Sequence, residues 1–104
     1  MNSVLHQTDL FHYHQDPDDH WDLACQFAFA YLGEIELKGV IIDYPENNPF
    51  GDPALLSVGQ LNRITGHYVP VGTGLSVNQT KKPDQIKNNG AIRLVLDTLK
   101  NSPV

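Results

Sequence analysis

The chain of 104 residues has little of several features that mark particular protein classes. Its single cysteine, Cys25, cannot close an internal disulfide, and its N-terminus lacks the basic and apolar regions of a secretory signal. No apolar run approaches the roughly 18 residues that a membrane-spanning helix needs. Seven Lys and Arg residues against 12 Asp and Glu give a net charge of -5, which opposes binding to a phosphate backbone. The sequence therefore predicts a cytoplasmic protein with neither membrane nor nucleic acid as partner.

The rest of the pattern predicts one α/β domain over residues 1–104. Short apolar stretches alternate with segments in which apolar residues recur every three or four positions, as in the strands and helices of a parallel sheet. The expected strands are residues 10–14, 35–42 and 69–71, and the expected helices are residues 21–32, 53–66 and a third from Gly90 onward. Gly33 and Gly66 are expected to end the first two helices. This βαβαβα order is typical of a Rossmann-like sheet. The polar residues before position 10 are expected to be frayed.

The segment between the first expected strand and helix is strongly acidic. It holds four carboxylates within seven residues, namely Asp16, Asp18, Asp19 and Asp22. Carboxylates this close raise one another's pKa values unless a cation or a helix N-terminus neutralises them. Ca²⁺ or Mg²⁺ suits such an all-oxygen set better than a soft metal. A plainer interpretation stays open, in which one aspartate caps the helix, Asp22 complements its dipole and the others are solvated.

Several segments in succession resemble the nucleoside hydrolase family. Residues 16–18 (DPD), followed by Asp22 and an apolar helix, are similar to the acidic loop that opens that family. Residues 33–40 (GEIELKGV) are similar to its next strand, and residues 61–66 (LNRITG) and 69–71 (VPV) to its second helix and the strand after it. The likeness covers nearly the whole chain. It implies that residues 1–104 correspond to the N-terminal portion of the family's α/β fold.

The resemblance implies hydrolysis of the N-glycosidic bond of a ribonucleoside, as in nucleoside salvage. In that family Ca²⁺ holds the ribose hydroxyls and a water molecule, which an aspartate deprotonates. Asp18 matches the position that binds the metal and activates the water. Asp16 matches a supporting acidic position of the metal site, and Asp22 matches the aspartate that meets both the metal and the ribose. Asn47 matches a substrate-binding asparagine after the second strand.

The sequence departs from the family pattern at two points. Leu23 stands where the family has a further aspartate ligand. The family also takes a ligand aspartate and a histidine that assists the leaving base from its C-terminal half, and residues 1–104 contain no counterpart of that half. The resemblance therefore implies catalysis only when the missing part is supplied.

Two other functions stay open. One is a non-catalytic module of the same fold that pairs an exposed sheet edge with another chain, which predicts a homo-oligomer. The other is a zinc-dependent hydrolase or deacetylase using His14, Asp18, Asp19 and His20, because imidazole and carboxylate groups ligate zinc. Residues 17–19 (PDD) are similar to the acidic loop of zinc-dependent deacetylases.

Two further signals have structural interpretations. Trp21, in the first turn of the expected helix, is expected to be a packing anchor rather than a stacking surface for a base or sugar. Residues 71–74 (VGTG) lack the spacing and the lysine of a phosphate-binding loop, and are expected to form a flexible strand exit.

Overall fold

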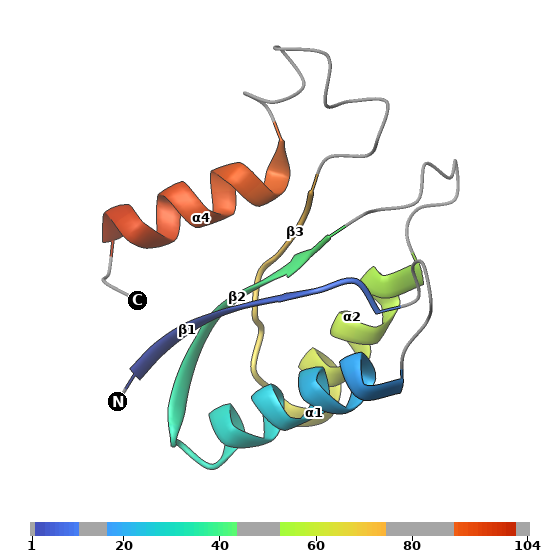
Figure 1. The fold of residues 1–104 in the computed structure, drawn as a ribbon. Coiled ribbons are helices and arrows are strands. Elements are labelled where there is room, and N and C mark those ends of the chain that lie inside the picture. Colours follow the sequence, from blue (N-terminus) through green and yellow to red (C-terminus); the bar gives the residue numbers. More distant parts are fainter. Residues whose placement is uncertain (1, 11–16, 44–52, 75–88, 102–104) are drawn as a thin grey trace.

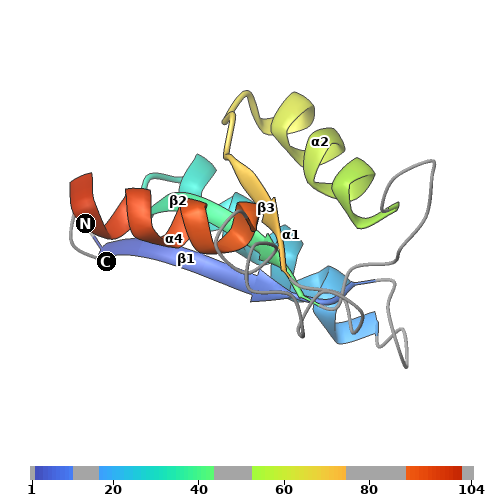
Figure 2. The same ribbon diagram turned by 90° about the horizontal axis from the view of Figure 1, so that it is seen from above.

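The computed structural model describes residues 2–10, 17–43, 53–74 and 89–101. Their elements are β1 (Asn2–Thr8), α1 (Pro17–Tyr31), β2 (Ile35–Ile42), α2 (Pro53–Thr65), β3 (Val71–Thr73) and α4 (Gly90–Asn101). The strands form one parallel sheet in the order β1-β2-β3 (Figure 1). Helices α1 and α2 lie on one face of this sheet and α4 lies on the other (Figure 2). The predicted α/β class, βαβαβα order and Rossmann-like arrangement are confirmed.

The first strand lies earlier in the chain than the sequence predicted. β1 occupies Asn2–Thr8, which were expected to be frayed, while Leu10 lies in a turn with a φ of 45°. The prediction of residues 10–14 as the first strand was therefore wrong, and residues 11–14 lie outside the described residues. β1 is an edge strand that packs one face against α1, so it needs few apolar residues and gives a weak sequence signal.

Helices α1 and α2 end as the glycine signals predicted. Gly33 and Gly66 have φ values of 78° and 74°, in the left-handed region that favours glycine. After α1, the Gly33 N–H donates to the Ala30 carbonyl and the Glu34 N–H donates to the Phe29 carbonyl, which is the Schellman pattern. These stops turn the chain back into β2 and toward β3.

The hydrophobic core lies between the sheet and the helix pair α1 and α2. Its largest fully buried side chains include Phe27 and Leu23 from α1 and Val58 from α2. They pack against residues of the central strand, among them Val40 and Ile42. Leu23 is 1% exposed, so the residue at the family's aspartate position is part of this core. A carboxylate there would be desolvated without a partner.

Trp21 does not pack in this core. Its side chain is 71% exposed, so the prediction that it anchors α1 was wrong. An indole in the first turn of a helix packs in the core only if that position lies on the side of the helix that faces the sheet. In α1 the buried positions are Leu23, Phe27 and Ala30, which leaves Trp21 on the outer side.

The segment after α2 is held by a side chain. The amide group of Asn62 accepts a hydrogen bond from the Val69 N–H at 2.9 Å and donates one to the Val69 carbonyl at 3.2 Å. Val69 is buried but precedes the strand, which begins at Val71, two residues later than predicted. The expected strand over residues 69–71 is thus a connection, buried at Val69, followed by β3.

Helix α4 sits close to β3 because of a glycine. A Cβ atom on Gly72 would lie 2.8 Å from the Gly90 carbonyl oxygen and 2.9 Å from the Ala91 Cα. Gly72 is therefore a point of close backbone approach within a strand, and not the flexible exit that the sequence predicted. The Asn89 side chain caps α4 by accepting from the N–H groups of Ala91 and Ile92.

In the described part of the chain, no helix has the length and apolar character that crossing a membrane demands.

Candidate functional site

A polar hollow of about 420 Å³ lies at the carboxyl edge of the sheet. Its lining residues are Gln7, Thr8, Asp9, Asp19 and Asp43, and we call it the carboxyl-edge hollow. Thr8 ends β1, Asp43 directly follows β2, and Asp19 lies in the first turn of α1. Parallel strands end together at this edge, where open α/β sheets bind their ligands.

Hydrogen bonds fix the strand ends that form the hollow. The Asp43 N–H donates to the Thr8 carbonyl at 2.8 Å, so the two strands remain paired up to the hollow. The Gln7 side-chain amide donates to the Asp43 carboxylate at 3.0 Å and orients it. The Gly74 N–H donates to the Ile42 carbonyl at 2.8 Å and extends the pairing toward β3.

The described lining of the carboxyl-edge hollow carries acidic side chains and no basic ones. The hollow is lined by the three carboxylates of Asp9, Asp19 and Asp43, and no Lys or Arg is among its described lining residues. The N-terminus of α1 lies beside it, since Asp19 belongs to the first turn of that helix. The partial positive charge of a helix N-terminus offsets only a fraction of one carboxylate charge. Because the carboxylate charges exceed the partial positive charge of the helix N-terminus, the hollow favours a cation or a ligand rich in hydroxyl donors.

Thr8 adds a buried polar atom to this site. The residue is 7% exposed, and its Oγ1 has no hydrogen-bond partner among the described residues. A buried hydroxyl without a partner is costly, so such an atom in a native structure calls for an explanation. Because Thr8 lines the hollow, a bound ligand or ion there would supply the partner.

The predicted site residues are distributed differently from the sequence expectation. Asp18 lies in the first turn of α1, is exposed and does not line the carboxyl-edge hollow, whereas its neighbour Asp19 does. Asp22 is also exposed and does not line the hollow. The predicted metal residue Asp16 and the predicted substrate residue Asn47 lie outside the described residues.

Asp22 acts on a histidine instead. His6 projects from β1, and its Nε2 is buried with no hydrogen-bond partner in the described residues. Burial lowers the pKa of His6 below its ordinary value of 6.5, and the negative charge of Asp22 partly opposes that shift. Burial thus favours the neutral form of the His6 imidazole, and Asp22 favours its protonated form.

The donor atoms of the hollow suit one class of metal. Carboxylate and hydroxyl oxygens match Ca²⁺ or Mg²⁺, whereas zinc prefers nitrogen and sulfur ligands. Within the described ranges, no three His, Cys, Asp or Glu side chains are grouped so that they could hold a metal ion. The hollow therefore provides oxygen donors of the right chemistry, but its described carboxylates are not grouped closely enough to bind a metal ion as they stand. Of the predicted zinc ligands, His14 lies outside the described residues.

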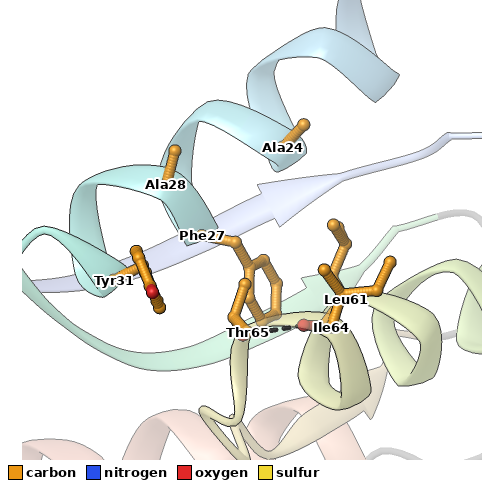
Figure 3. A pocket seen from close by; sticks show the side chains of 7 residues that line it. All are labelled: Ala24, Phe27, Ala28, Tyr31, Leu61, Ile64 and Thr65. Atoms are coloured by element: carbon orange, nitrogen blue, oxygen red, sulfur yellow. Dashed lines mark hydrogen bonds between the residues drawn. The ribbon is translucent and has the colours of Figure 1, made fainter.

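A second hollow of about 380 Å³ lies between α1 and α2 (Figure 3). The residues that line this apolar groove are Ala24, Phe27, Ala28, Tyr31, Leu61, Ile64 and Thr65. The Thr65 hydroxyl already donates to the Leu61 carbonyl at 2.7 Å. The described residues that line the apolar groove include no carboxylate or imidazole group. The groove therefore has no group for acid–base catalysis, and its apolar side chains provide a surface for packing.

Sequence reasoning missed four residues of the carboxyl-edge hollow. Gln7, Thr8 and Asp9 were missed because the first strand was placed too late in the chain. Asp43 could have been found, since it follows the correctly predicted strand over residues 35–42, and residues at the carboxyl ends of parallel strands line ligand sites.

Comparison of the chain with protein-family models, with curated proteins and with solved structures returns no match. What is established of its class is the fold, a small α/β domain with a three-stranded parallel sheet.

Proposed function

We propose that the chain is a nucleoside hydrolase-like protein that binds a divalent cation, Ca²⁺, together with a ribose-like sugar in the carboxyl-edge hollow. The observation that carries the proposal is that Asp9, Asp19 and Asp43 line one hollow together with Thr8, whose buried hydroxyl has no hydrogen-bond partner among the described residues. The acidic loop and the GEIELKGV stretch support the same class through their resemblance to that family. The alternative of zinc hydrolysis has less support, because the described donors of the hollow are oxygen atoms.

The described residues divide into two roles. Asp9, Asp19 and Asp43 bring carboxylates to the hollow, and they would have to draw together to hold the cation, because no three acidic side chains of the described residues are grouped for this. The Thr8 hydroxyl lines the same hollow and can hydrogen-bond a sugar hydroxyl. A bound divalent cation lowers the pKa of a coordinated water and orients vicinal hydroxyl groups. The resemblance makes Asp18, next to Asp19 on the first turn of α1, the proton acceptor for the attacking water. Asp18 is exposed and does not line the hollow, so this role requires its side chain to turn toward the hollow. The proposed cation contact moves from Asp18 to Asp19.

Cleavage of an N-glycosidic bond needs a second group that protonates the departing base. No histidine or lysine is among the described residues that line the carboxyl-edge hollow. The proposal for these residues is therefore cation and ribose binding, with catalysis dependent on an acid supplied from elsewhere. The lack of a histidine or lysine among the described lining residues also favours a second candidate function, a non-catalytic binding module that uses the same hollow.

Isothermal titration calorimetry tests the proposal. The chain is titrated with Ca²⁺, in the absence and in the presence of ribose, beside variants that each remove one negative charge. Asp43→Asn is expected to weaken Ca²⁺ binding by about tenfold or more, because one carboxylate fewer faces the ion. The matched control Glu34→Gln removes an exposed carboxylate after α1 and should bind like the parent chain.

The adjacent pair Asp18 and Asp19 sharpens the same experiment. Asp19→Asn is expected to weaken Ca²⁺ binding, and Asp18→Asn is expected to retain it, because only Asp19 lines the hollow. Absence of binding heat from a folded parent chain would contradict the proposal. Equal affinities of the parent chain and Asp43→Asn would contradict the assigned location.

A further inference from the structure

Strand β1 has one hydrogen-bonded neighbour in the described part of the sheet, which is β2. The Thr8 carbonyl accepts from the Asp43 N–H, so the backbone groups of Thr8 point toward β2. Backbone groups alternate from one side of a strand to the other along the chain. Ser3, Leu5 and Gln7 therefore direct their N–H and C=O groups to the free edge.

The free edge of β1 carries none of the features that usually prevent strand pairing. Natural edge strands are protected by Lys and other charged side chains, by Pro or by bulges on the edge strand. The sequence of β1, NSVLHQT, contains no Lys, Arg, Asp, Glu or Pro, in a chain with a net charge of -5. The register shift next to Val4 places its extra residue in β2, at Lys38, and leaves β1 regular.

An apolar surface on the α4 side adjoins this edge. A Cβ atom on Gly39 would lie 3.1 Å from a methyl carbon of Leu5 and 3.0 Å from one of Leu94, so these two leucines meet over Gly39. A hollow of about 260 Å³ lies beside them, between Gln7, Ile41 and α4. Leu96 of α4, which lines this hollow together with Gln7, is 60% exposed. The α4 side of β1 thus borders an exposed leucine.

We propose that two copies of this chain pair through β1, antiparallel, about a two-fold axis at Leu5. Leu5 then exchanges two N–H···O hydrogen bonds with Leu5 of the partner subunit, and Ser3 and Gln7 do the same with Gln7 and Ser3 of the partner subunit. The three strands of each copy join in one continuous sheet. Both α4 helices lie on the same face of that sheet.

The sequence of β1 favours a second copy as the occupant of its edge. A two-fold interface requires a surface that is complementary to itself. Around Leu5, the pairing sets Ser3 against Gln7 and Val4 against His6, so no like charges are opposed. The outward backbone groups of Ser3, Leu5 and Gln7 lie symmetrically about the centre and match those of an identical antiparallel strand.

Sedimentation analysis of the chain and two edge variants tests this pairing. The parent chain is expected to sediment with twice the 11.6 kDa of one copy at high concentration. Ser3→Pro removes an N–H from the free edge only and should give the single-copy mass, while the matched control Ser3→Ala keeps that N–H and should remain paired. Leu5→Lys sets like charges against each other at the axis and should also abolish pairing.

Hydrogen exchange keeps the proposal testable if the edge variants do not fold. In the parent chain, exchange of the Ser3, Leu5 and Gln7 amides should slow as protein concentration rises. A parent chain that stays at 11.6 kDa, with edge exchange independent of concentration, would overturn the pairing. A paired mass that persists in folded Ser3→Pro and Leu5→Lys would also overturn it, because the interface would then lie elsewhere.

Discussion

The two faces of the sheet are covered in different ways. On one face, α1 and α2 contribute fully buried side chains such as Phe27 and Val58. On the other, α4 approaches the strands at glycines, with its backbone against Gly72 and with Leu94 over Gly39. Among the α4 residues, Ala91 is the one that is fully enclosed. The first face depends on side-chain volume and the second on the absence of a side chain, so the two faces should respond to opposite kinds of substitution.

Removal of side-chain volume should have its largest effect on the α1 face. Phe27→Ala is expected to lower the free energy of unfolding by about 3–5 kcal/mol, because it leaves a cavity at a fully buried position. Leu99→Ala on α4 should change it by less than about 0.5 kcal/mol, since that side chain is largely exposed. Chemical denaturation measures both values. Similar losses for the two variants would show that the faces do not differ in this way.

Addition of one methyl group should have the opposite pattern. Gly72→Ala is expected to cost about 1–3 kcal/mol, because its Cβ would meet the backbone of Gly90 and Ala91, which cannot yield as a side chain end can. The matched control Gly59→Ala, in α2, meets no atom within 4 Å and should stabilise the chain by up to about 1 kcal/mol. Thermal unfolding distinguishes them, and a neutral Gly72→Ala would refute the close approach of α4.

Loss of the α4 cap should have a smaller effect. Asn89→Ala removes the oxygen that accepts from the N–H groups of Ala91 and Ile92, at 3.0 and 3.2 Å. It is expected to lower the free energy of unfolding by about 1 kcal/mol. Asn89→Asp retains an acceptor and should lose less. Equal losses in both variants would indicate that the cap does not hold α4 in place.

The smallest effect expected is a pH dependence from the α1 face. Burial lowers the pKa of His6 in the folded chain, with Asp22 opposing, so the unfolded chain binds the proton more readily. The free energy of unfolding should therefore fall as the pH drops through 6.5 toward the lower folded value. Denaturation at a series of pH values should show this slope, a flatter one in His6→Leu and a steeper one in Asp22→Asn. An unchanged slope in His6→Leu would assign the effect to other groups.

The sequence predicted best those elements that local chemistry defines. The glycine stops at Gly33 and Gly66 and the apolar run of β2 are local signals, and all three were located correctly. β1 was misplaced because its pairing with β2 holds it in the sheet, and that pairing is not visible in a polar seven-residue sequence. Gly72 was misinterpreted because the atoms that require a glycine there come from a helix 18 residues later, at Gly90.

Of the acidic segment that the sequence singled out, the structure places Asp19 at the carboxyl-edge hollow. The acidic segment and the rule of carboxyl strand ends indicated an oxygen-lined site at this edge, and Asp19 lies in it. Which of two adjacent aspartates faces the hollow depends on the rotation of α1, which Leu23 and Phe27 set by packing in the core. Thr8 and Asp9 could not be assigned while the first strand was placed too late.

The most direct test of the central claim is to locate ligand binding on the structure. Amide NMR spectra of the nitrogen-labelled chain would be recorded during titration with Ca²⁺ and then with ribose. We predict that the signals of Thr8, Asp9 and Asp43 shift, while those of Ile64 in the apolar groove and Leu96 on α4 do not. Shifts that avoid the carboxyl-edge hollow, or no shifts in a folded chain, would contradict the claim.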